Sequence, residues 1–324
     1  MSLTRRHVLS LGAAFGAGAA LPAWAQGKPL FETLNMFVPA APGGGWDGTA
    51  RAIEKAAKAA SLVGNMPFEN VGGAGGMVGL PRYVNQRKGQ GNSLMVAGSV
   101  MVGAAIANKS PVTMRNVTPI ARLTEEAGVI VVPASGNLKT WKDLAAALKA
   151  NPKAVSVAGG SAGGTDHLLL GMVVKALGAN PREAAYVAFA GGGPANAAIL
   201  GGQVAAGISG WSEFEAQITA GRMIPLAVSG NKRIPGVNVP TLTELGLNVT
   251  AANWRGVFAP PGITWPQREA LVEFMSRVHA SAAWKQELET RKWTDVFLSG
   301  LPFEREIEAN VRETEQVMKD LGLA

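Results

Sequence analysis

Short apolar runs alternate with amphipathic stretches along most of the chain. An apolar run bounded by turn residues is typical of a buried strand, and apolar positions three or four residues apart are typical of a helix. The runs predict strands at 34–38, 66–71, 93–98, 118–123, 129–132, 155–158, 185–189, 204–209, 225–229 and 253–259. The stretches between them predict helices at 49–59, 77–86, 101–107, 138–150, 168–177, 196–200, from 211 onward, at 266–288 and at 303–321. Strands that alternate with helices indicate an α/β fold with mostly parallel sheets.

The length and the strand pattern predict two domains. At 324 residues the chain is long enough for two hydrophobic cores of ordinary size. A candidate crossing into a second domain lies between the strands at 118–123 and 129–132. We therefore expect a discontinuous first domain, 27–126 plus 250–324, with a second domain, 127–249, inserted into it.

Composition narrows the class of protein. Hydrophobic residues make up 47% of the chain, charged residues only 16%, and 41 residues are glycine, which together indicate a compact globular protein. The formal net charge is +7, but lysine and arginine are scattered, so we expect no nucleic-acid partner. The absence of cysteine and the presence of only three histidines exclude thiolate chemistry and nearly exclude a histidine metal site. We expect no cofactor, no metal and a monomer.

Residues 1–25 have the three parts of an export signal. Arg5 and Arg6 charge the start, a short apolar segment follows, and Ala23-Trp24-Ala25 predicts cleavage before Gln26. The arginine pair resembles a twin-arginine signal, and an ordinary Sec signal is the alternative. Either signal predicts an exported, periplasmic protein.

Three predicted strand-to-helix junctions are rich in glycine: Pro42–Asp47, Gly159–Thr165 and Gly191–Ala195. We call them the first, second and third glycine turns. A strand that leads through glycines into a helix exposes free backbone N–H groups at the positive end of the helix dipole, which suits an anion. A plain turn is the alternative for each one alone. Because the arrangement recurs, we expect the three turns to converge on one cleft and to hold a carboxylate.

Several side chains in and near these turns are candidates for ligand contacts. The hydroxyl groups of Ser161 and Thr165 would add hydrogen-bond donors. Trp46 and Trp211 are rigid walls of the kind that binding clefts use, and core packing is the alternative for each. Asp47 would repel a carboxylate that it faced, so we expect it to cap its own helix or to orient a water molecule.

A further glycine-rich segment, Gly72–Gly76, follows another predicted strand. The spacing of Gly73, Gly75 and Gly79 is one residue longer than the dinucleotide-binding fingerprint, and no suitable acidic residue follows the next strand. The sequence therefore argues against a nicotinamide or flavin site.

One motif raises the alternative of a serine hydrolase. Gly159–Gly163 matches the G-x-S-x-G nucleophile elbow, with Ser161 as the nucleophile, and lies between a strand and a helix. The partners are poorly placed, because His167 lies on the helix that follows and His279 lies on an ordinary amphipathic helix. No His-Gly-Gly-Gly oxyanion segment exists in the chain. We therefore expect a binding protein and not an enzyme.

Several short segments recur in a specific order and spacing from about Phe31 to the end: Val38-Pro39 with Pro42–Asp47, Glu69–Gly76, Ser161–His167, Gly192–Ala195, Gly201–Val204 and Val239–Leu242. In these segments the chain resembles the periplasmic substrate-binding proteins of tripartite tricarboxylate transporters, also called the Bug family. The resemblance implies an α/β, two-domain fold of the periplasmic-binding-protein type II class. It also implies a hinge that lets the domains close on a small carboxylate.

Carried over by position, the resemblance places the ligand at the three glycine turns. The residues that it implies are Pro42, Gly43, Gly44, Gly45, Trp46, Asp47, Ser161, Ala162, Gly163, Gly164, Thr165, Gly191, Gly192, Gly193, Ala195, Trp211 and Arg255. Many members have Thr where this chain has Trp46, which we expect to reshape the pocket. Arg255 is a candidate partner for a second carboxylate, and a structural salt bridge near the hinge is the alternative.

The resemblance also implies a function. It predicts a solute-binding protein that captures a small di- or tricarboxylate and delivers it to membrane transporter subunits. The alternatives are the serine hydrolase that uses Ser161 and a ligand-sensing subunit for a membrane receptor.

Overall fold

The computed structural model describes residues 28–323, and the predicted leader with its cleavage site lies outside them. The strands are β1 (Phe31–Thr33), β2 (Asn35–Val38), β3 (Val63–Asn65), β4 (Phe68–Asn70), β5 (Ser93–Gly98), β6 (Thr118–Pro133), β7 (Val157–Gly159), β8 (Tyr186–Ala188), β9 (Ala206–Gly210), β10 (Met223–Val228), β11 (Ala252–Ala259) and β12 (Thr294–Ser299). The helices are α1 (Gly45–Ala59), α2 (Gly79–Gln86), α3 (Ser99–Ala107), α4 (Trp141–Ala150), α5 (Thr165–Ala176), α6 (Gly192–Leu200), α7 (Trp211–Thr219), α8 (Trp265–Ala280), α9 (Ala282–Arg291) and α10 (Leu301–Leu321). Within the described residues, no helix combines the length and the apolar composition that crossing a bilayer would require.

A mixed sheet runs through the molecule in the order β4-β2-β5-β11-β6-β9-β7-β8. Its two ends are parallel, because β2 pairs with β4 and β5, and β7 pairs with β8 and β9, in the same direction. Its middle is antiparallel, because β11 pairs with both β5 and β6, and β6 pairs with β9, in opposite directions. The α/β class is confirmed, and the expected parallel pairing holds at the outer strands.

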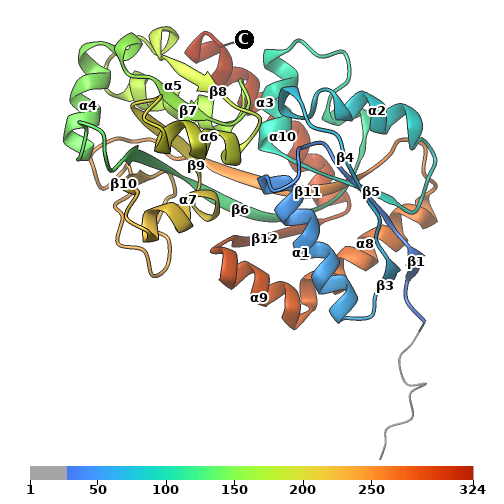
Figure 1. The fold of residues 1–324 in the computed structure, drawn as a ribbon. Helices are drawn as coiled ribbons and strands as arrows, with labels where there is room; N and C mark the ends of the chain where they lie inside the picture. Colours follow the sequence, from blue (N-terminus) through green and yellow to red (C-terminus); the bar gives the residue numbers. More distant parts are fainter. Residues whose placement is uncertain (1–27, 324) are drawn as a thin grey trace, which may run out of the picture.

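The strand β6 is continuous over 16 residues, whereas the sequence predicts two strands at 118–123 and 129–132. Its first part pairs with β11 and β12, and its last part pairs with β9 and β10. Figure 1 shows β6 and β11 running side by side through the middle of the molecule. The polar side chains of Thr124 and Glu126 interrupt the apolar pattern, although both are buried within the strand.

The C-terminal part differs from its prediction in two places. The helix expected at 266–288 is two helices, α8 and α9, because Ser281 ends the first and caps the second by accepting the N–H of Trp284 at 3.2 Å. The strand β12 is absent from the prediction, as are β1 and β3, which form a separate two-stranded sheet. These strands are partly exposed, so they lack a continuous apolar run.

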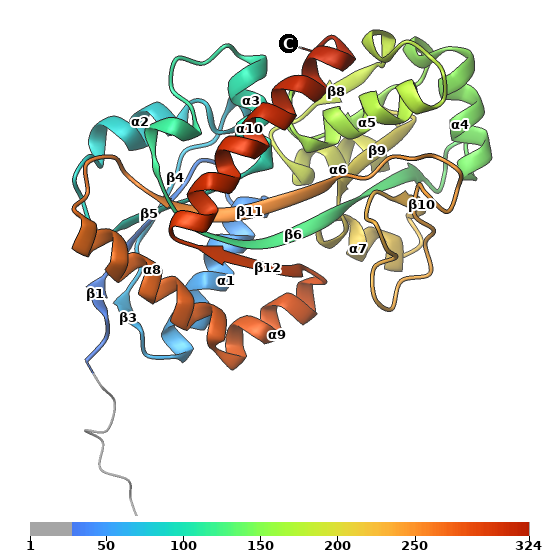
Figure 2. The same ribbon diagram turned by 180° about the vertical axis from the view of Figure 1, so that it is seen from behind.

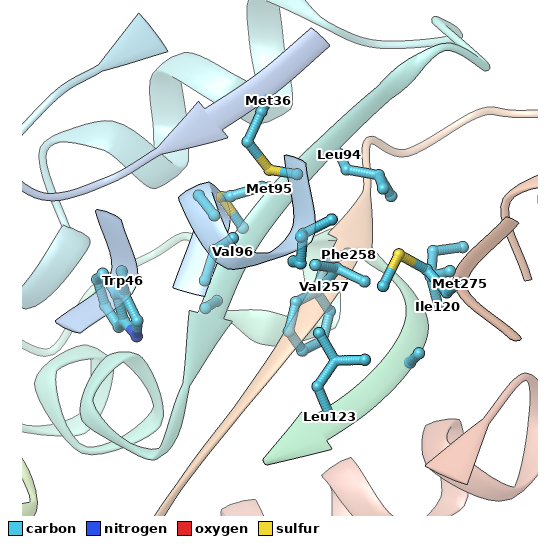
Figure 3. Close-up of a cluster of buried hydrophobic side chains, with 14 of the residues drawn as sticks. Met36, Trp46, Leu94, Met95, Val96, Ile120, Leu123, Val257, Phe258 and Met275 are labelled. Carbon is cyan, nitrogen blue, oxygen red and sulfur yellow. The ribbon is translucent and has the colours of Figure 1, made fainter. Parts of the chain in front are cut away.

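Buried apolar side chains form three clusters in two parts of the chain. The largest draws on residues within 34–123 and 254–307. Figure 3 shows part of it, where side chains from β5, β6 and β11 pack together. The two other clusters draw on residues within 129–249. We call the first part the first lobe and the second part the second lobe, and the predicted domain boundaries themselves stay a prediction.

The helix α10 packs on both lobes. Phe303 and Ile307, near its start, belong to the first-lobe cluster. Near its end, a Cβ built on Gly171 of α5 would lie 2.9 Å from the Cδ1 of Leu321. Figure 2 shows α10 crossing the back of the molecule and ending beside the second lobe. The last helix therefore connects the lobes in addition to β6 and β11.

Candidate functional site

A cavity of about 410 Å³ lies between the two lobes, a volume that suits one small-molecule ligand. Its walls come from the starts of α1 and α3 and from β11 in the first lobe, and from the starts of α5, α6 and α7 in the second. The lining residues are Pro39, Ala40, Ala41, Gly44, Gly45, Trp46, Gly72, Gly73, Ala74, Gly75, Gly76, Val100, Gly160, Ser161, Gly164, Thr165, Asp166, Ala190, Gly191, Gly192, Ser209, Glu213, Asn253 and Arg255.

All three glycine turns line this one cavity. The helices α1, α5 and α6 begin directly after Gly44, Gly164 and Gly191, so three helix N-termini face the same space. The predicted site residues that line it are Gly44, Gly45, Trp46, Ser161, Gly164, Thr165, Gly191, Gly192 and Arg255. The geometry thus brings together residues that are far apart in the sequence.

The other predicted site residues do not line the cavity, and each group has its own reason. The exposed tips of the turns hold Pro42, Gly43, Ala162 and Gly193. Gly163 is buried against α3. Ala195 and Trp211 pack in a second-lobe cluster, so Trp211 has the core-packing role that the sequence analysis gave as its alternative. Asp47 is turned back toward its own loop.

Asp47 stabilises the first glycine turn from behind. It is the third residue of α1, and its carboxylate accepts the Gly43 N–H at 3.1 Å and the Asn70 Nδ2–H at 3.0 Å. Burial by itself would raise the pKa of Asp47, but these hydrogen bonds and Arg51, at 3.6 Å, hold it below its ordinary value. The carboxylate is therefore engaged within the protein and holds the loop before α1, whereas the N-cap residue of the helix, Gly44, has no side-chain cap.

The Gly72–Gly76 segment lines the cavity, although the sequence prediction leaves it out of the site. Gly75 has a φ of +64°, and a Cβ there would lie 2.5 Å from the Cβ of Ala104 and 3.3 Å from that of Ser161. Glycine at this position therefore permits close approach of the first lobe to the second glycine turn. The signal that could have found it is the one used for the other turns, a glycine-rich junction between a strand and a helix.

Trp46 is both a core residue and part of the cavity wall. Its side chain is 7% exposed and belongs to the first-lobe cluster, at one edge of which Figure 3 shows it. A Cβ on Gly76 would lie 3.0 Å from the indole ring. A change at Trp46 would therefore alter core packing and pocket shape together.

Arg255 forms a buried ion pair with Glu126 where β6 and β11 cross between the lobes. Arg255 Nη2 lies 2.8 Å from Glu126 Oε2, and the two side chains are 2% and 1% exposed. Glu126 Oε1 accepts the Ser212 N–H at 2.8 Å and the Ser212 hydroxyl at 2.6 Å, at the start of α7. Arg255 therefore forms the structural salt bridge that the sequence analysis gave as its alternative role. The same side chain lines the cavity, and its Nη1 group has no hydrogen-bond partner among residues 28–323.

Two acidic side chains that the sequence prediction omits also line the cavity. Asp166 Oδ2 accepts the Gly160 N–H at 2.8 Å, and Glu213 Oε2 accepts the Ser209 hydroxyl at 2.6 Å. Burial raises the pKa of Asp166 to about 7, and nearby Glu213 adds to the rise, against the Gly160 N–H and the charge of Arg255. No local sequence signal marks this pair, because only the convergence of α5 and α7 brings the two carboxyl groups together.

The raised pKa of Asp166 predicts that this residue destabilises the ligand-free protein as the pH rises. Between an ordinary aspartate pKa of about 4 and the folded value of about 7, the folded protein retains a proton that the unfolded chain has lost. The contribution of Asp166 to the free energy of unfolding therefore falls as the pH rises through that window. We expect Asp166→Asn to raise the Tm at about pH 8 and to leave it nearly unchanged at about pH 4, as measured by scanning calorimetry. A shift in Tm that is the same at both pH values would contradict this.

The two histidines among the described residues are engaged elsewhere than at Ser161. His167 Nδ1 accepts the Gly163 N–H at 3.1 Å, and its ring stacks on Tyr186 with centroids 4.4 Å apart. His279 pairs with Asp295 at 2.9 Å. The described residues therefore do not form the serine–histidine pair that a hydrolase of the nucleophile-elbow type requires.

Comparison with known proteins decides the family. The model of the tripartite tricarboxylate transporter family receptor matches residues 50–323. The chain belongs to this family. The protein BugT of Bordetella pertussis is 29% identical to this receptor over 252 residues, which make up 76% of each chain.

Two solved structures at 25% identity are similar to this receptor over nearly their whole length. The periplasmic binding protein BugD has a TM-score of 0.79, with 90% of this chain and 98% of BugD covered. MatC from Rhodopseudomonas palustris, with bound malate, has a TM-score of 0.75, with 89% of this chain and 99% of MatC covered. These likenesses confirm the expected periplasmic-binding-protein fold.

As a receptor of the tripartite tricarboxylate transporter family, the chain is a solute-binding protein. Its family and its structural neighbours are binding proteins. They give no support to the serine-hydrolase alternative or to the sensing alternative.

Proposed function

We propose that this receptor binds a small di- or tricarboxylate in the cavity between its lobes and delivers it to membrane transporter subunits. The observation that carries the proposal is the convergence of three helix N-termini on one cavity of about 410 Å³. The start of α1 belongs to the first lobe, and the starts of α5 and α6 belong to the second. Because free N–H groups and helix dipoles favour negative charge, a carboxylate between them is held from both sides.

The proposed mechanism of capture is closure of the lobes on the ligand. A carboxylate anchored by one lobe adds favourable contacts when the other lobe approaches, so the bound state favours the closed arrangement. Malate, which is bound in the structure of MatC, is a small dicarboxylate of the proposed kind. We propose that the leader at 1–25 exports the protein to the periplasm, where it acts as a monomer without a cofactor.

A thermal-shift screen tests the ligand class. A ligand that binds only the folded protein stabilises it by RT ln(1 + [L]/Kd), which is about 2.7 kcal/mol at a hundredfold excess over Kd. We expect at least one small di- or tricarboxylate to raise the Tm by several degrees, and the corresponding amides, which lack the negative charge, to leave it unchanged. If no carboxylate raises the Tm, or if an amide does so equally, the proposed ligand class is wrong.

A further inference from the structure

Two acidic side chains of the cavity form no ion pair with any of residues 28–323. Asp166 accepts hydrogen bonds from the Gly160 N–H at 2.8 Å and the Thr165 hydroxyl at 3.4 Å, and Glu213 accepts one from the Ser209 hydroxyl, so every donor is a neutral group. Neither carboxyl group forms an ion pair with a side chain of the described chain. A ligand that carried only carboxylates would meet like charge at this wall of the cavity.

The position of Glu213 depends on a glycine of the third turn. A Cβ on Gly192 would lie 2.6 Å from Glu213 Oε1 and 2.8 Å from its Cδ. Any side chain larger than hydrogen at Gly192 would therefore displace the carboxyl group from where it lies. The start of α6 thus leaves room for an acidic group that faces the ligand space.

The cavity lining also includes a cationic side chain, Arg255, that has an unpaired N–H group within residues 28–323. Arg255 is 2% exposed, and its Nη2 pairs with Glu126, but its Nη1 group is buried without a partner in the described structure. The start of α1 lies beside it, because a Cβ on Gly45 would be 2.8 Å from Arg255 Nη2. A buried guanidinium N–H group without a protein partner is costly unless a ligand accepts it, and a carboxylate is the matching acceptor.

We propose that the ligand is an amino dicarboxylate, bound with a carboxylate toward Arg255 and the start of α1 and with its ammonium group toward Asp166 and Glu213. This inference rests on the proposed carboxylate-binding function and narrows the ligand class. It follows from charge complementarity, because the cavity offers one free positive donor and two unpaired carboxyl groups. The ammonium group supplies the cation that the acidic pair lacks.

The charged and titratable groups around Asp166 give the proposal a pH signature. Glu213 of α7 and Arg255 of β11 are the charged groups that act on Asp166, and Arg255 is itself paired with Glu126. Tyr186 of β8 donates its hydroxyl group to the Gly160 carbonyl oxygen at 2.8 Å. The neighbouring His167 is stacked on Tyr186, and burial lowers its pKa, which keeps it neutral. An ammonium group beside Asp166 favours the ionised carboxylate, so affinity for an amino acid should rise as the pH increases through about 7.

Matched ligand pairs test the inference on the intact protein by isothermal titration calorimetry, with and without EDTA. Aspartate is compared with succinate, and glutamate with glutarate, because each pair differs only in the amino group. We expect the amino member of at least one pair to bind about 10- to 100-fold more tightly at about pH 8. Glu213→Gln and Asp166→Asn should each reduce this preference about tenfold or more. The matched control is Glu215→Gln, on the same helix, whose carboxylate lies 3.7 Å from Lys292 and outside the cavity lining.

The outcomes separate this inference from the proposed function. If neither aspartate nor glutamate binds more tightly than its counterpart without the amino group, the inference is overturned and the carboxylate function stands. Tighter binding of succinate at low pH would overturn it as well, because a protonated Asp166 would then donate to a ligand carboxylate. Binding that EDTA abolishes would point to a metal-bridged carboxylate and would also overturn it. If no acid of either kind binds, the proposed function itself fails.

Discussion

Replacing Arg255 by methionine is expected to lower the free energy of unfolding by about 3–5 kcal/mol. The substitution leaves Glu126 buried, 1% exposed, without its counter-ion at 2.8 Å. The remaining partners of Glu126 are the N–H and hydroxyl of Ser212, which cannot neutralise a full negative charge away from water. Urea unfolding followed by fluorescence measures the change.

A second substitution separates the charge effect from packing. Changing Glu126 to glutamine in the Arg255→Met background removes the uncompensated charge and should restore much of the lost stability. Arg277→Met is the control, because Arg277 pairs with Glu273 on the exposed face of α8 and should cost at most about 1 kcal/mol. A loss in the double variant as large as in Arg255→Met alone would contradict the ion-pair explanation.

The same variants report on ligand binding. Arg255 lines the cavity, so the double variant should recover stability and still bind a carboxylate at least about tenfold more weakly than the unchanged protein. A double variant that recovers both stability and affinity would show that Arg255 has a structural role only.

The hydrophobic pattern predicts most of the fold because most elements are amphipathic or wholly apolar. The strand β5 is buried at every position, and its predicted range coincides with the observed one. The pattern fails at β6, where Glu126 continues the strand because Arg255, more than a hundred residues later, neutralises it. The hydrophobic pattern does not show such a distant partner. A buried polar residue within a strand is therefore predicted as the end of that strand.

The candidate site is predictable from the sequence where a single short segment of the chain encodes the feature. The glycine turns are local, since a strand, a few glycines and a helix start suffice to mark them, and all three line the cavity. Asp166 and Glu213 are not local, because each reads as an ordinary acidic residue in the first turn of a helix. Their role at the cavity depends on how α5 and α7 converge, which neither segment encodes alone.

Replacing Gly103 of α3 by alanine is expected to weaken ligand binding about 5- to 150-fold, since overpacking typically costs about 1–3 kcal/mol. Gly103 packs backbone to backbone against the second glycine turn, and a Cβ there would lie 2.0 Å from the carbonyl oxygen of Gly163. The backbone of the turn cannot yield as a flexible side chain would, so the lobes must move apart. The helix start at Thr165 would then move away from the first lobe.

The Gly103→Ala change should act on closure more than on folding, and the two are separable by measurement. In the open form that the proposed closure mechanism requires, the lobes are apart, so the added methyl group should not meet Gly163, and alanine is favoured over glycine in a helix by about 1 kcal/mol. The Tm of the ligand-free variant should therefore be unchanged or higher, while calorimetric titration with the best ligand of the thermal screen shows the loss of affinity. Gly193→Ala is the matched control, because it lies in the first turn of α6 with no atom within 4 Å of the added Cβ. If Gly103→Ala binds as tightly as Gly193→Ala, the contact between α3 and the second glycine turn plays no part in closing the cavity.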